Sequence, residues 1–192
     1  MQSLGAISAL AAVLLLGGCG GPEVNIESAD PYARYLGLLE LSQGEPDEQS
    51  LQRILRALED PAFLVREGAL RAIIRVRQPG LAARAAPLLT DPHPLARIAA
   101  CDVLSHFRLG EFAPDLIRRR EEDPEGSVRR AAVKALAAIP ATPEILRALV
   151  AALDDADPSV PLFAQERLAA VSGRKYPASD RGAWEAWLKE SR

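Results

Sequence analysis

Apolar residues recur along the chain with the spacing of an α-helix, and the same pattern returns at a nearly constant interval. Four copies can be aligned on an apolar anchor, at Val65, Ala96, Val128 and Val160. The even spacing of these anchors falls within the period of roughly 20–50 residues that is typical of a solenoid built from stacked supersecondary units.

The segment after each anchor is predicted to be an amphipathic helix. Apolar residues lie 4, 8 and 11 positions after the anchor, and these offsets share one face of a helix with 3.6 residues per turn. The residue at offset 4 is alanine in all four copies: Ala69, Ala100, Ala132 and Ala164. Small residues on this face allow neighbouring helices to approach closely, and a larger side chain would cost ~1–3 kcal/mol.

A second set of helical segments precedes the anchors. Apolar stripes predict first helices over 47–58, 79–89, 112–120 and 143–153. Each is separated from the following anchor by an acidic turn that ends in Asp-Pro, or in Asp-Ala-Asp-Pro in the last copy. Aspartate can cap the next helix and proline stops the preceding one, so each copy is expected to be a pair of helices.

Both ends of the repeat array are expected to carry a capping helix. At the N-terminal end, residues 30–46 begin with Asp30-Pro31 and place Tyr32, Tyr35, Leu36 and Leu39 on an apolar stripe. At the C-terminal end, residues 173–192 contain Trp184 and Trp187 at helical spacing. These indoles can fold over the open end of the last repeat, or they can form an aromatic docking surface for a partner.

Aspartate and arginine recur six residues apart at the start of three of the second helices. The pairs are Asp60 with Arg66, Asp91 with Arg97, and Asp123 with Arg129. This pattern resembles the signature of HEAT repeats over residues 47–172. The resemblance implies an all-α fold, a right-handed α-solenoid of about four helix pairs. It also implies a ladder of hydrogen bonds between neighbouring repeats.

In that ladder Arg129 is interpreted as the partner of Asp123. The fourth copy keeps Asp155 but has Pro161 where the arginine would stand, so the ladder is expected to end there.

The N-terminal segment 1–18 is predicted to be a lipoprotein signal peptide. Residues 4–18 are uncharged and apolar or small, but too few to span a membrane, which needs roughly 20 residues. The ending Leu16-Gly17-Gly18-Cys19 resembles the bacterial lipobox, which implies that Cys19 is lipidated and that 19–29 form a tether. The preceding Met1-Gln2-Ser3 lacks the usual Lys or Arg. The alternative is a buried N-terminal helix with an incidental cysteine.

A lipid on Cys19 would place the protein in a bacterial cell envelope, anchored to a membrane and facing the extracytoplasmic space. Gly20 replaces the aspartate that commonly retains lipoproteins in an inner membrane, which favours an outer membrane. Cys101 lies on the apolar face of a repeat helix and is interpreted as a small buried hydrophobe.

Charged and nucleophilic residues form no recognisable catalytic or metal motif in the sequence. His93 and His106 lack a second ligand at metal spacing, so no metal and no cofactor are expected. The net charge is −3, and Arg118-Arg119-Arg120 is followed at once by three acidic residues, which argues against nucleic acid. The acidic turns could line one edge as a ridge for a basic partner or weak Ca²⁺, or they could simply cap helices.

The sequence therefore predicts a non-catalytic scaffold or assembly factor that binds an unknown protein. Its surface is expected on the second helices, at positions facing away from the apolar stripe: Glu67, Arg71, Arg75, Arg130 and Lys134. Two other functions occur among HEAT-like proteins and are alternatives to this one. They are a bilin-lyase-like enzyme and a DNA-binding protein, and export to the envelope disfavours both. No small-molecule substrate is indicated.

Overall fold

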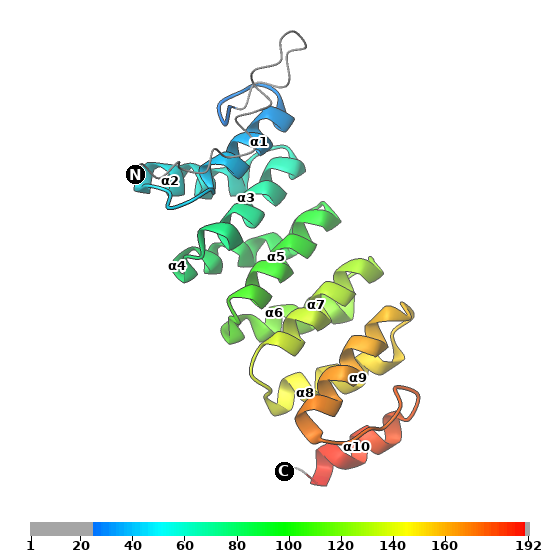
Figure 1. Cartoon of the computed structure of the whole chain (residues 1–192). Coiled ribbons are helices and arrows are strands. Elements are labelled where there is room, and N and C mark those ends of the chain that lie inside the picture. The colour runs from blue at the N-terminus through cyan, green and yellow to red at the C-terminus, as the bar shows by residue number, and fades with distance from the viewer. Residues whose placement is uncertain (1–24, 191–192) are drawn as a thin grey trace, which may run out of the picture.

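The computed structural model describes residues 25–190, and every regular element in that range is a helix. The helices stack one pair after another along an elongated molecule, from α1 at one end to α10 at the other (Figure 1). This confirms the all-α solenoid predicted from the repeat. The predicted signal peptide, Cys19 and the beginning of the tether lie outside the described residues.

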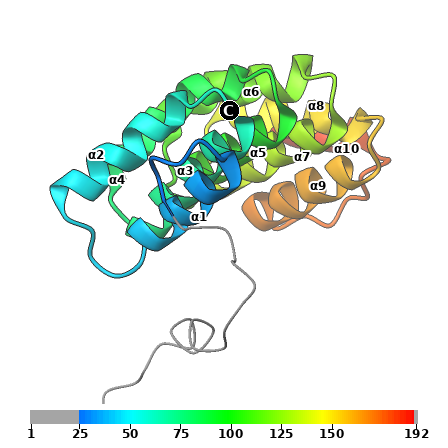
Figure 2. The same ribbon diagram turned by 90° about the horizontal axis from the view of Figure 1, so that it is seen from above.

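The helices form two layers, which Figure 2 shows from above. The second-helix layer consists of α1 (Pro31–Leu41), α3 (Phe63–Val76), α5 (Pro94–His106), α7 (Gly126–Ala138) and α9 (Ser159–Ser172). The first-helix layer consists of α2 (Glu48–Arg56) with η2 (Ala57–Glu59), α4 (Pro79–Ala82) with η3 (Ala83–Thr90), η4 (Gly110–Phe112) with α6 (Ala113–Glu122), and α8 (Pro143–Ala151) with η5 (Ala152–Asp154). The last helix of the described range is α10 (Arg181–Glu190).

The first helices are less regular than the sequence predicts. The segment expected to be one helix over 79–89 is divided into the short α4 and a 3₁₀ stretch, η3, that contains Pro87. Proline has no backbone N–H to donate and its ring disturbs the preceding turn, so a continuous α-helix is not maintained there.

The alanines at offset 4 lie at the centre of the core. Ala69, Ala100, Ala132 and Ala164 are completely buried, and so are the larger residues at offset 8. At offset 11 the pattern is weaker: Ile139 is buried, Val76 and Phe107 are partly buried, and Val171 of the last copy is 38% exposed. The small offset-4 side chains let each second helix pack closely against its neighbours, as the repeat predicts.

Helix α1 turns a different face to the core than the sequence suggested. Its buried residues are Ala33, Gly37 and Leu38, whereas Tyr32 from the predicted stripe is 49% exposed. Ala33 lies one repeat length before Val65, and it occupies the anchor position of a fifth copy. The helix therefore packs as the second helix of an additional, degenerate repeat.

Gly37 is needed at its position in α1. It occupies offset 4 of this fifth copy, and a Cβ there would lie 2.7 Å from the backbone nitrogen of Ile26. The segment that leads into α1 thus crosses directly over the glycine, closer than a real Cβ could tolerate.

Helix α10 closes the other end of the solenoid. The Trp184 side chain is fully buried, and its Nε1–H donates to the carbonyl oxygen of Pro177 at 3.2 Å. The Tyr176 ring meets it edge-on with ring centroids 5.0 Å apart, and Trp187 packs beside it, partly buried. Of the two interpretations of these tryptophans, the structure favours the cap, because Trp184 belongs to the core.

Candidate partner-binding surface

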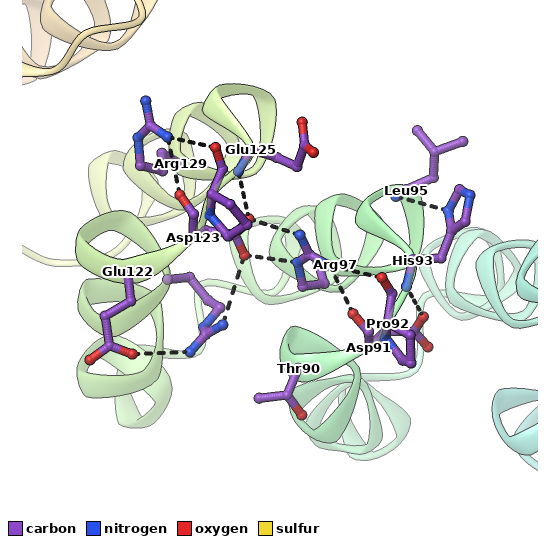
Figure 3. A network of polar contacts seen from close by, with 12 residues as sticks. Thr90, Asp91, Pro92, His93, Leu95, Arg97, Glu122, Asp123, Glu125 and Arg129 are labelled. Carbon is purple, nitrogen blue, oxygen red and sulfur yellow. Dashed lines mark hydrogen bonds and ion pairs between the residues drawn. The ribbon is translucent and has the colours of Figure 1, made fainter.

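Two sets of charged residues lie on the second helices, and the first set forms the ladder. Arg97 shows one rung in full (Figure 3). Its Nε and Nη2 donate to the two carboxylate oxygens of Asp123, both at 2.8 Å, and its Nη1 donates to the carbonyl oxygen of Asp91 at 2.9 Å. Asp123 Oδ1 also accepts the backbone N–H of Glu125 at 3.1 Å. Each rung therefore joins a guanidinium, a carboxylate and two turns.

The same geometry repeats in Arg34–Asp60, Arg66–Asp91 and Arg129–Asp155. Each arginine reaches the aspartate carboxylate of the next repeat, while its own turn offers only main-chain carbonyl oxygens. The pairing of Arg129 with the Asp123 carboxylate was therefore wrong. Arg129 binds the Asp155 carboxylate at 2.8 Å and the Asp123 carbonyl oxygen at 3.1 Å, because the Asp123 carboxylate faces back toward Arg97. Within the described residues the last rung ends on Asp155, since Pro161 has no side chain that can donate onward.

Arg34 is the member of the ladder that sequence reasoning missed. It donates to both Asp60 oxygens at 2.8 Å and to the carbonyl oxygen of Ser28 at 2.9 Å. The signal was present in the sequence, because Ala33-Arg34 precedes Val65-Arg66 by one full repeat.

The ladder occupies four aspartates of the predicted acidic ridge: Asp60, Asp91, Asp123 and Asp155. The hydrogen bond from Arg129 lowers the pKa of Asp155. Burial acts to raise the pKa values of Asp60 and Asp91, but hydrogen bonds from arginine and from the backbone outweigh it and lower both. Asp123 is only 2% exposed. These four carboxylates are committed to holding repeats together and are not presented to a basic partner. Within the described range, no group of three or more His, Cys, Asp or Glu side chains lies close enough together to hold a metal ion.

The predicted partner-binding residues divide into two groups. Arg71, Arg75 and Lys134 are exposed on the second helices, as expected. Glu67 is only 8% exposed and forms an ion pair with Arg71, so its assignment to the surface was wrong. Arg130 is half-buried and donates to Ser159 Oγ at 3.2 Å. Glu67 and Arg130, the two residues whose assignment changes, both lie at offset 2. For Arg130 this position faces α9, the next second helix, rather than solvent.

A row of charges at offset 6 was missed by the sequence interpretation. Arg71, Asp102, Lys134 and Glu166 are all exposed and alternate in sign from one second helix to the next. Asp102 lies in the field of both Arg71 and Lys134, yet its pKa is raised, because partial burial outweighs the two cations. Among the described ion pairs, none joins one member of this row to another.

Apolar grooves run beside the charged row. One, of about 280 Å³, lies between α3 and α5 and is lined by the apolar Ile74, Leu95, Ile98 and Ala99 together with the charged Glu67, Arg71 and Asp102. A second lies across α5, α7 and α9, where Lys134 Nζ is 6.0 Å from the centre of the Phe163 ring.

Two exposed leucines, Leu95 (50%) and Leu162 (64%), stand on the same surface. We refer to the surface made by the offset-6 row and these two leucines as the outer second-helix face. It combines apolar contact area with separated charges, as protein interfaces do.

Family comparison agrees with the geometry of the ladder. The family model described as HEAT repeats matches residues 51–137 and again residues 81–169, which together span more than half of the chain. A search of curated proteins finds no significant match. Across residues 25–190, no helix is both long and apolar enough to cross a membrane. The chain belongs to the HEAT-repeat family.

Proposed function

We propose that this protein is a membrane-anchored, non-catalytic scaffold or assembly factor that binds another protein through its outer second-helix face. One observation carries the proposal: the offset-6 charges are exposed, ordered one per repeat, and unconnected to one another by the ion pairs of the described range. Arg71 also pairs with Glu67 of its own helix, whereas no ion pair of the described range involves Asp102, Lys134 or Glu166. HEAT repeats typically serve as non-catalytic helical scaffolds, and a rigid solenoid offers an extended surface for this purpose.

The alternation of sign favours a protein over a nucleic acid as the partner. A phosphate backbone would meet Asp102 and Glu166 between the cations, and repulsion from these carboxylates would offset the attraction to Arg71 and Lys134. A protein surface can present charges of both signs at matching intervals, which gives specificity and orientation as well as attraction.

Membrane attachment through Cys19 is the second part of the proposal and rests on the lipobox-like Leu16-Gly17-Gly18-Cys19. Cell fractionation and lipid labelling of wild type and Cys19→Ala test it. Labelled, membrane-bound wild type and unlabelled, released variant support the anchor. A soluble, unlabelled wild type would reject it.

The binding function is tested by cross-linking cells and recovering the full-length chain from detergent-solubilised membranes. The variant Arg71→Glu/Lys134→Glu reverses two cations of the outer second-helix face. The matched control, Arg84→Glu/Arg147→Glu, makes the same change of charge at exposed positions of the first-helix layer. We expect wild type and control to recover the same protein and the face variant to lose it. Equal recovery by all three would contradict the proposed surface.

A further inference from the structure

The offset-6 row has a symmetry that points to one particular partner. Along the solenoid the signs run positive, negative, positive, negative, at Arg71, Asp102, Lys134 and Glu166. Read from the opposite end, the signs run negative, positive, negative, positive, so each charge of the reversed row is opposite in sign to the charge at the same place in the original row. A second copy laid antiparallel would therefore place Arg71 against Glu166 and Asp102 against Lys134, and the two-fold axis would repeat both pairs. A parallel arrangement would instead place like charges together.

We propose that the outer second-helix face binds a second copy of this chain, as an antiparallel two-fold dimer. The axis would run along the second helices, between α5 and α7. Helix α5 would then face α7 of the second copy, and α3 would face α9. Contacts of this kind are isologous, because the same patch serves both subunits. This inference rests on the proposed function and names the partner of the same face.

The apolar residues fit the same arrangement. A rotation about an axis parallel to the helices keeps each offset at the same height. Leu162, at offset 2 of α9, would thus lie opposite Glu67, at offset 2 of α3, and close to Ile98, at offset 2 of α5, both of which line the groove between α3 and α5. Leu162 is 64% exposed in the single chain, and insertion into this groove would remove it from water.

The face is also large enough for a stable dimer. The helices α3, α5, α7 and α9 contain 14, 13, 13 and 14 residues. With a rise of about 1.5 Å per residue and a spacing of about 8–10 Å, they present roughly 600–800 Å² per copy. A standard specific interface buries about 800 Å² on each partner. An uncompensated like-charge contact in such an interface is strongly unfavourable, so the sign of each charge decides the arrangement.

The test is sedimentation of the full-length chain in a density-matched detergent, over a range of protein concentrations. We expect wild type to form dimers. In Lys134→Glu the new carboxylate at position 134 would face the carboxylate of Asp102 in the second copy, twice per dimer. This repulsion should weaken dimerisation roughly ten-fold or more. The double variant Asp102→Lys/Lys134→Glu restores both contacts across the axis, although it places like charges side by side within each chain. It should dimerise nearly as well as wild type, and at concentrations low enough for every chain to be monomeric all variants should keep the wild-type melting temperature.

Failure of this inference can be told apart from failure of the proposed function. A chain that stays monomeric up to about 100 μM, or a dimer indifferent to Lys134→Glu, would overturn the inference. So would a double variant as weak as the single one. The wild-type chain could be monomeric and still recover a different protein that Arg71→Glu/Lys134→Glu fails to recover. In that case the scaffold function stands without the dimer. Restored dimerisation in the double variant supports the two-fold arrangement whatever other partner is recovered.

Discussion

The second helices carry two rows of charge that differ in almost every physical respect. At offset 1, Arg34, Arg66, Arg97 and Arg129 each make two hydrogen bonds to a carboxylate of the next repeat and lie largely buried. At offset 6, only five residues further along the helices α3, α5, α7 and α9, the charges are exposed and make no ion pair from one described repeat to another, although Arg71 pairs with Glu67 of its own helix. The first row is committed to the fold, and the second remains available to another molecule.

The difference shows how one repeat encodes both stability and recognition. The side chain at offset 1 points into the turns between helices, where backbone carbonyl oxygens and an aspartate carboxylate accept its hydrogen bonds at the same position in each ladder repeat. Since every rung needs the same chemistry, arginine is retained at this offset wherever another repeat follows. Offset 6 faces outward and has no such constraint, so its residues vary in sign. Changes to the two rows should therefore have opposite consequences.

Asp123→Ala should produce the largest loss of stability. Asp123 is 2% exposed and accepts two hydrogen bonds from Arg97, and Arg119 lies 3.8 Å away. Removing the carboxylate leaves a buried guanidinium uncompensated, which costs about 3–5 kcal/mol. Urea denaturation measures the change in the free energy of unfolding. The exposed Asp102→Ala is the control, with an expected change below about 0.5 kcal/mol. Equal effects of the two variants would remove the distinction between the rows.

Ala132→Leu should have the next largest effect. Ala132 is completely buried at offset 4, where second helices approach most closely. The added methylenes must displace neighbours, at a cost of about 1–3 kcal/mol. The comparison is Ala170→Leu, at an exposed position of α9, which should leave the unfolding free energy within about 0.5 kcal/mol. A tolerated leucine at 132 would mean that the repeats do not depend on close packing there.

Acidification should weaken the ladder. The folded-state pKa values of Asp60, Asp91 and Asp155 are lowered, so their contribution is complete above the unfolded value of about 3.9 and is lost as the pH falls through the folded values. Stability should thus decline below about pH 4, whereas Asp102, with a raised pKa, acts in the opposite direction. Asp155→Asn cannot titrate, so its unfolding free energy should differ less between pH 7 and pH 3. An unchanged difference would contradict the role of this rung.

Lys134→Glu should have the smallest effect on stability. Its side chain is exposed, its Nζ lies 6.0 Å from the centre of the Phe163 ring, and it acts on Asp102 through its charge without an ion pair. We expect the free energy of unfolding to stay within about 0.5 kcal/mol of wild type while binding through the face is lost. A strongly destabilised Lys134→Glu would place this residue with the structural row instead.

Most of the fold follows from periodicity alone. The alanines at offset 4 and the recurring Asp–Arg spacing identify the helix pairs, because close packing and the ladder leave few residue types possible at those positions. The N-terminal end was harder to predict. The repeat containing Ala33 and Gly37 is degenerate, and the stripe predicted for α1 included Tyr32, which is 49% exposed, while its other members are only partly buried.

The binding surface was less predictable than the fold. Position on a helix face does not reveal whether a neighbouring helix covers a side chain, which is why Glu67 and Arg130 were assigned to the surface. The ladder partner of Arg129 depends on how one repeat lies against the next, which spacing within a repeat does not specify. The alternating row can be found from the sequence alone, by comparing the residues at offset 6 in the four aligned copies.

Site-specific photo-cross-linking in cells tests most directly whether the outer second-helix face is the one that binds. A photoreactive amino acid is placed at Arg75 or Leu95 on the second-helix layer, and at Arg84 or Arg147 on the first-helix layer, all exposed positions. We expect protein adducts from the second-helix positions only, with an adduct of twice the chain mass if the partner is a second copy. Adducts from the first-helix positions alone, or equally from both layers, would contradict the assignment of recognition to the offset-6 row.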